Sequence, residues 1–141
     1  MCWISNNLRI KTAKTDIPVW KVVYPTNYNF PNKCCSLYTR FVYVKGDLEM
    51  TPMNFDVRMS TVNGNGGFHS YSDKVSWRKI DDFISVFKEK TLFHSEIFIT
   101  KYHQEDAKIA KFHIPKGYRY AENNEGEIIS SAIIFDNFID S

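Results

Sequence analysis

The chain has few of the residues and runs that would place it in a specialised class of protein. Its 141 residues include only three cysteines, six glycines and five prolines, which argues against a disulfide-rich scaffold and against a low-complexity chain. No apolar run approaches the roughly 18 residues of a membrane span. Lys and Arg number 18 against 16 Asp and Glu, for a formal net charge of +2. No strong field of one sign therefore favours nucleic acid or an anionic membrane as a partner.

Motifs with metal-binding or catalytic spacing are also missing from the sequence. Cys2, Cys34 and Cys35 lack the further thiol or well-spaced histidine of a tetrahedral metal site, and adjacent cysteines do not form an unstrained disulfide. The four histidines show no HxxxH or HxH spacing, and neither a Walker loop nor a dinucleotide fingerprint occurs. The sequence therefore predicts reduced thiols, no metal, no cofactor and no catalytic residue.

Apolar and aromatic residues are plentiful. They make up 43% and 16% of the chain, which argues against disorder and for a β-rich fold. A chain of this length is typical of one domain with one core. We therefore expect a single domain over residues 1–141, with the polar residues 1–16 as a candidate extended arm. The N-terminus lacks the apolar region of a signal peptide, which predicts a cytoplasmic protein.

Alternation of apolar and polar residues predicts several strands, at residues 19–24, 36–45, 55–61, 96–102 and 108–114. The segment 36–45 is apolar on both faces, which is typical of a central strand. From Val75 to Phe87 the apolar residues recur near the helical period, and Ser72 or Asp73 can cap a helix of roughly 15 residues. The sequence thus predicts an α+β fold, a mostly antiparallel sheet with one principal helix packed on one face.

The C-terminal segment, residues 110–138, carries the most specific local signal. Asn123-Asn124-Glu125-Gly126 suits a type I turn with Gly126 in the left-handed conformation, which is the chemistry of a short hairpin loop. We expect Ile128, Ile133 and Phe135 to be buried against the apolar face of the predicted helix.

The best candidate for a ligand site is the segment GGFHSYS, which contains Gly66, Gly67, His69, Ser70 and Tyr71. Glycines let a backbone approach a ligand closely, and a helix that begins near residue 73 would offer free N–H groups to an anion. The alternative is a structural loop that needs glycine for its turns.

Tyr120 adds an aromatic ring that could stack on a ligand, together with other strand aromatics. Aromatic residues on strands more often serve core and cross-strand packing. The small net charge argues against a nucleic-acid partner.

Three motifs occur in a recognisable order: an early VWKVV strand, GFHSYS at the start of a helix, and IPKGYRYAENNEGEIISSAIIF near the end. This order resembles uncharacterised small proteins of gut bacteria and their phages. The resemblance implies a compact α+β domain from a mobile element, and a location in the host cytoplasm if a phage encodes it.

A more distant likeness is to ADP-ribosyltransferase-like folds, which have an early strand residue that contacts nicotinamide adenine dinucleotide (NAD) and a late essential glutamate. Lys21 stands where those folds have Arg or His, and Glu125 or Glu127 corresponds to the late acid. This likeness implies an NAD-binding enzyme as the alternative function. The leading hypothesis is a non-enzymatic binding module that recognises a host protein or a small ligand.

Overall fold

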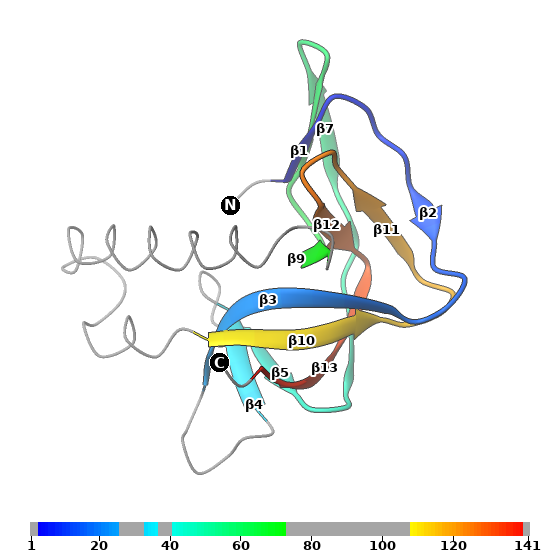
Figure 1. Ribbon diagram of the computed structural model, residues 1–141. Coiled ribbons are helices and arrows are strands. Elements are labelled where there is room, and N and C mark those ends of the chain that lie inside the picture. The colour runs from blue at the N-terminus through cyan, green and yellow to red at the C-terminus, as the bar shows by residue number, and fades with distance from the viewer. Residues whose placement is uncertain (1–2, 26–32, 37–40, 73–107, 140–141) are drawn as a thin grey trace, which may run out of the picture.

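The computed structural model describes residues 3–25, 33–36, 41–72 and 108–139, which form strands and connecting turns (Figure 1). Two antiparallel sheets result: a three-stranded sheet in the order β1-β8-β7, and a ten-stranded sheet in the order β2-β11-β12-β9-β3-β10-β13-β6, with β4 and β5 attached beside β3. The thirteen strands are β1 (Trp3–Ser5), β2 (Lys11–Thr12), β3 (Ile17–Pro25), β4 (Lys33–Ser36), β5 (Val42–Val44), β6 (Leu48–Met50), β7 (Phe55–Arg58), β8 (Thr61–Gly64), β9 (Phe68–Ser72), β10 (Lys108–Ile114), β11 (Arg119–Glu122), β12 (Glu127–Ser130) and β13 (Ala132–Phe138).

The prediction of an α+β fold with one principal helix is wrong, because the described residues contain strands and no helix. The segment predicted as that helix, and the strand predicted at 96–102, lie outside the described residues. Part of the predicted site loop is itself a strand, β9, which pairs with β12 on one side and with β3 on the other. Pairing on both sides outweighs the weak strand propensity of its His and Ser residues.

Two predicted strands are hairpins instead. The segment 36–45 holds the last residue of β4 and all of β5, which pair antiparallel with each other, and the Ser36 N–H donates to the Phe41 carbonyl at 2.9 Å. The segment 55–61 turns at Met59 and Ser60, which both have positive φ, at 51° and 66°. Apolar alternation continues across each turn in the sequence, so the periodicity alone does not reveal the reversal.

Strand β3, whose core was predicted at residues 19–24, is shared by three neighbours. Strand β10 pairs with it along one edge, from Ile17 opposite Ile114 to Val23 opposite Lys108. On the other edge, β9 pairs with the first half of β3, ending at Trp20 opposite Tyr71. From Val23 onward, β4 pairs with this edge in place of β9. The sheet therefore forks along β3, and we call the two positions between β9 and β4, residues 21 and 22, the fork.

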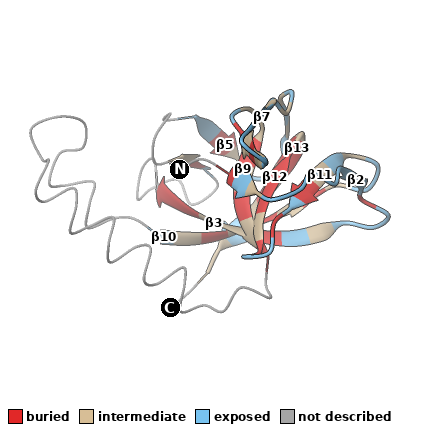
Figure 2. Ribbon diagram, turned by 90° about the horizontal axis from the view of Figure 1, so that it is seen from above, coloured by how far each residue is buried: buried red, intermediate tan, exposed pale blue. Residues whose placement is uncertain are grey.

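The strands on one side of the fork close into a ring. From β3 the pairing passes through β4 to β5, and residue Lys45, just after β5, forms a bridge to Phe135 in β13. Strand β13 pairs with β10, which returns to β3. Buried residues follow the middle strands of the large sheet (Figure 2). The main core cluster comprises Ala13, Val19, Val23, Cys34, Tyr43, Phe68, Ala110, Phe112, Ile114, Ile128, Ile133 and Phe135.

A second cluster joins the small sheet to the large one, and it consists of Trp3, Val62, Ala121 and Ile129. The indole N–H of Trp3 donates to the Glu127 carbonyl at 2.8 Å. The side-chain N–H of Asn123 donates to the Ile4 carbonyl, also at 2.8 Å. Within the segment expected as an N-terminal arm, β1 is therefore fixed to the β11–β12 turn.

The C-terminal turn has the predicted geometry. Gly126 has φ of 77°, and its N–H donates to the Asn123 carbonyl at 3.1 Å. Strands β11 and β12 pair on either side of this turn. Ile128, Ile133 and Phe135 are buried as expected, but among the described residues they pack within the main core cluster rather than on a helix.

We expect Gly126→Val to lower the free energy of unfolding by roughly 1 to 3 kcal/mol, because a β-branched residue is strained at positive φ. Gly126→Asn is the matched control and should cost less, since asparagine tolerates the left-handed region. Urea unfolding of the three proteins measures the difference. Equal stability of the valine and asparagine variants would contradict a left-handed requirement at this turn.

Candidate functional site

Lys21 lies at the fork, on the core face of β3. It lies two residues from Val19 and from Val23 and so shares their face of the strand, and both valines are fully buried. Its ammonium donates a hydrogen bond to the backbone carbonyl of His69 in β9 and lies 5.8 Å from the centre of the Tyr43 ring. Continuing the β3–β9 register would place Val22 opposite His69, but the pairing stops at Trp20. Lys21 thus supplies the donor that the ladder no longer gives to this carbonyl.

Burial sets the protonation of the groups around Lys21. It lowers the pKa of Lys21 to about 8, and the nearby Cys34 thiol opposes the shift in part. Burial also raises the pKa of Cys34 to about 12, with Cys35 adding to the effect. For Tyr43 burial again raises the pKa, while for His69 burial and the Lys21 charge together lower the pKa to about 4. At neutral pH the lysine is therefore the charged member of this group.

The protonation of Cys34 and His69 does not suit nucleophilic or acid–base catalysis. A thiol is reactive as its thiolate, so a raised pKa makes Cys34 inert at neutral pH. A histidine that stays neutral down to about pH 4 is a weak base, because efficient general bases have pKa values near the working pH. The Lys21 group is therefore best explained as a structural element of the fork.

The glycines of the predicted site are required by the packing of the chain. A Cβ atom on Gly66 would lie 2.7 Å from the Pro52 carbonyl oxygen. Gly67 has φ of 90°, and a Cβ there would lie 2.9 Å from both an Ile129 side-chain atom and the Ser130 carbonyl. At both glycines the space that a side chain would need is occupied by neighbouring backbone and side-chain atoms of the protein.

The remaining predicted ligand residues are divided between the two faces of the large sheet. Ser70 pairs with the core residue Ile128, and Tyr120 packs against the main core cluster. Like Lys21, both lie on the core face. On the opposite face, Tyr71 stands between Trp20 on β3 and Glu127 on β12. His69 shares that opposite face, because it is two residues from Tyr71 in the same strand.

Two further polar features include residues outside the predicted set. The hydroxyls of Ser70, Ser72 and Ser130 are buried and find no hydrogen-bond partner in the described parts of the chain. On the outer face, Nδ1 of His113 lies 2.8 and 2.9 Å from the two carboxylate oxygens of Asp136. Across the described ranges, no three His, Cys, Asp or Glu side chains cluster as a metal site would require.

An apolar surface that was not predicted from the sequence lies on β6, a terminal strand of the large sheet. Glu49 pairs with the core residue Ile133, whereas Leu48 and Met50, on the other face of β6, pair with Ile134 and with the fully buried Ala132. Leu48 is 42% exposed and Met50 is 64% exposed. We call Leu48, Met50 and Ile134 the β6 strip. Its signal in the sequence is the alternation Leu-Glu-Met after the Gly46-Asp47 turn, but only the pairing with β13 reveals which face is outward.

Comparison with protein-family models, with curated proteins and with solved structures finds no match for this chain. None of the described residues belongs to a helix long and apolar enough to cross a membrane.

The lowered pKa of Lys21 has a consequence for stability. Below about pH 8 both the folded and the unfolded lysine are protonated, and the folded state carries the full cost of the buried ammonium. Between about 8 and 10.5 the unfolded chain keeps a proton that the folded state has lost, so the Lys21 contribution to stability rises with pH. Lys21→Met removes this titration.

We therefore expect the stability of the wild-type protein, relative to Lys21→Met, to rise by roughly 1 to 3 kcal/mol between about pH 7 and pH 10. Urea unfolding of both proteins at several pH values measures this difference. Because Cys34 is present in both, its opposite effect above pH 9 largely cancels. Lys108→Met, at an exposed lysine on β10, is the control and should track the wild type. A pH-independent difference for Lys21→Met would contradict a buried ammonium at the fork.

Proposed function

We propose that the protein is a non-enzymatic binding module that recognises a partner protein through the β6 strip. The observation that carries the proposal is the outward placement of Leu48 and Met50, 42% and 64% exposed, on the terminal strand of the sheet. Apolar side chains that gather at an exposed position mark interaction surfaces more often than scattered ones do.

The backbone of β6 adds a second means of recognition. A terminal strand presents unpaired N–H and C=O groups, and an extended segment of another protein can add a strand there. Backbone hydrogen bonds then supply affinity, and alternate side chains supply specificity. The flexible thioether of Met50 adapts to differently shaped apolar partners.

The same strand has features that limit unspecific pairing. It is three residues long, and Glu49 points to the core side. The pKa of Tyr43 is raised mainly by burial, then by Cys34, and the charge of Glu49 adds a smaller contribution. Short edge strands and inward-pointing charges both discourage open-ended strand addition. These features suit a surface that accepts one short segment rather than a growing sheet.

The division of the predicted ligand residues favours a protein partner over a small molecule. Lys21, Ser70 and Tyr120 lie on one face of the sheet, while Tyr71 and Glu127 lie on the other. The same division weighs against an ADP-ribosyltransferase-like enzyme, since Lys21 and Glu127 do not meet on one face. The resemblance to proteins of gut bacteria and phages supports an accessory role directed at a host protein in the cytoplasm.

Site-specific photocrosslinking tests the proposal in the bacterium that carries the gene, or in its host if the gene is viral. A benzophenone amino acid replaces Leu48, and in a matched control it replaces the exposed Thr12 on β2, the opposite terminal strand of the same sheet. We expect a discrete crosslinked protein from position 48 and none of that mass from position 12. Adding Met50→Asp should reduce the crosslink at least tenfold, because a charge at the strip opposes apolar docking. Identical crosslinking patterns from positions 48 and 12 would refute the proposal.

A further inference from the structure

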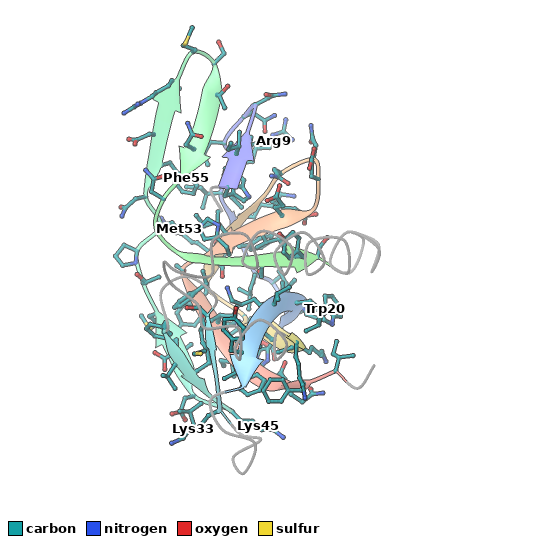
Figure 3. The ribbon with its side chains drawn as sticks, turned by 90° about the vertical axis from the view of Figure 1, so that its left-hand side faces the viewer. Arg9, Trp20, Lys33, Lys45, Met53 and Phe55 are labelled. Atoms are coloured by element: carbon teal, nitrogen blue, oxygen red, sulfur yellow. The ribbon has the colours of Figure 1, made fainter. Side chains whose placement is uncertain are left out.

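We propose that two copies of this chain associate through β7, which pairs antiparallel with β7 of the second copy about a two-fold axis at Val57. This interface is separate from the β6 strip. Strand β7 is one edge of the three-stranded sheet and pairs with β8 alone among the described strands. The hairpin of β7 and β8 projects from the rest of the described chain (Figure 1). Figure 3 shows Phe55 at its base and β7 on its outer side.

The backbone of β7 presents one residue at the centre of its free edge. Met59 and Ser60 both have positive φ, which defines a two-residue type I′ turn. Such a turn has a hydrogen bond from the N–H of Thr61 to the carbonyl of Arg58. Because hydrogen-bonding direction alternates along an antiparallel pair, Arg58 and Asp56 direct their backbone groups to β8. The N–H and C=O of Val57 therefore point to the free edge, where a second strand would bind them.

The side chains of β7 complement themselves under this two-fold operation. With Val57 opposite Val57 of the second copy, Asp56 lies opposite Arg58 of the second copy, and the same pair forms again on the other side of the axis. Both side chains are exposed. Arg58 has no ion-pair partner among the described residues, and Asp56 accepts one hydrogen bond, from Asn65 at 3.2 Å. Each dimer would therefore form two opposite-charge pairs across the interface.

Other registers of the same strand are less favourable. A two-fold axis at Asp56 or at Arg58 places like charges opposite each other. Parallel pairing in register does the same, because Asp56 then lies beside Asp56 of the second copy and Arg58 beside Arg58. Like charges directly opposite on neighbouring strands are destabilising. A shift by one residue would place side chains of opposite faces together. The arrangement centred on Val57 is the register that opposes unlike charges.

The apolar face of the hairpin also gains a neighbour in this arrangement. Val57 is 69% exposed and Met59 is 98% exposed. Val57 pairs with Val62, which belongs to the second core cluster. Association would extend this apolar layer across the axis, into a sheet that continues from one copy to the other. The contact is small, because β7 has four residues, so we expect a concentration-dependent dimer rather than a permanent one.

Charge reversal tests the proposed register directly. In sedimentation velocity across a concentration series, the wild-type chain should show a monomer–dimer equilibrium. Asp56→Arg makes both charged positions basic and Arg58→Asp makes both acidic, so each variant alone should bind itself at least tenfold more weakly than wild type. An equimolar mixture of the two variants restores both opposite-charge pairs and should form a heterodimer with close to wild-type affinity.

Val57→Pro provides an independent test, because proline removes the N–H that faces the free edge and leaves the bonds to β8 in place. This variant should be monomeric with a nearly unchanged melting temperature. Thermal unfolding of all three variants verifies that each is folded. A wild-type chain that stays monomeric at millimolar concentration would overturn the proposal. So would a mixture of Asp56→Arg and Arg58→Asp that associates no better than the separate variants, or a dimer that persists in Val57→Pro.

Discussion

The fold depends on the fork in β3, where one edge of a single strand passes from β9 to β4. Strand β3 is hydrogen-bonded both to the ring of strands and to the remainder of the large sheet. Backbone groups between two diverging strands have to find partners, because a buried unpaired carbonyl is costly. Lys21 meets this need with a side chain long enough to reach the His69 carbonyl. The cost is a desolvated ammonium, which is visible in a pKa lowered to about 8.

The parts of this fold that were predictable are those with a strong local signal. The long alternating runs of β3 and β10 and the Gly126 turn were found in the sequence because each follows from local backbone and side-chain preferences. Strand β9 was missed, since its polar residues become a strand only through pairing on both sides. The role of Lys21 could not be foreseen either, because its partner His69 is 48 residues away.

The candidate functional surfaces were hidden from sequence analysis for a related reason. Alternation in Leu48–Met50 and Phe55–Arg58 shows that each segment has two different faces, but not which face is outward or which edge is free. Those properties follow from pairing with β13 and β8. Among the residues predicted as a ligand site, Gly66, Gly67 and Lys21 have a packing role in the sheet, while β6 and β7, terminal strands of the two described sheets, carry exposed apolar side chains. Recognition at strand edges is therefore the common theme of the two proposals.

The most direct test of the fork is the titration of Lys21 by nuclear magnetic resonance. The chemical shift of its ε-methylene carbon can be followed from about pH 6 to pH 11 and assigned by comparison with Lys21→Arg. We expect a midpoint near 8, well below the ordinary pKa of 10.5, as burial at the fork requires. A midpoint near 10.5 would place the ammonium in solvent and would contradict the fork as the constraint on which this fold depends.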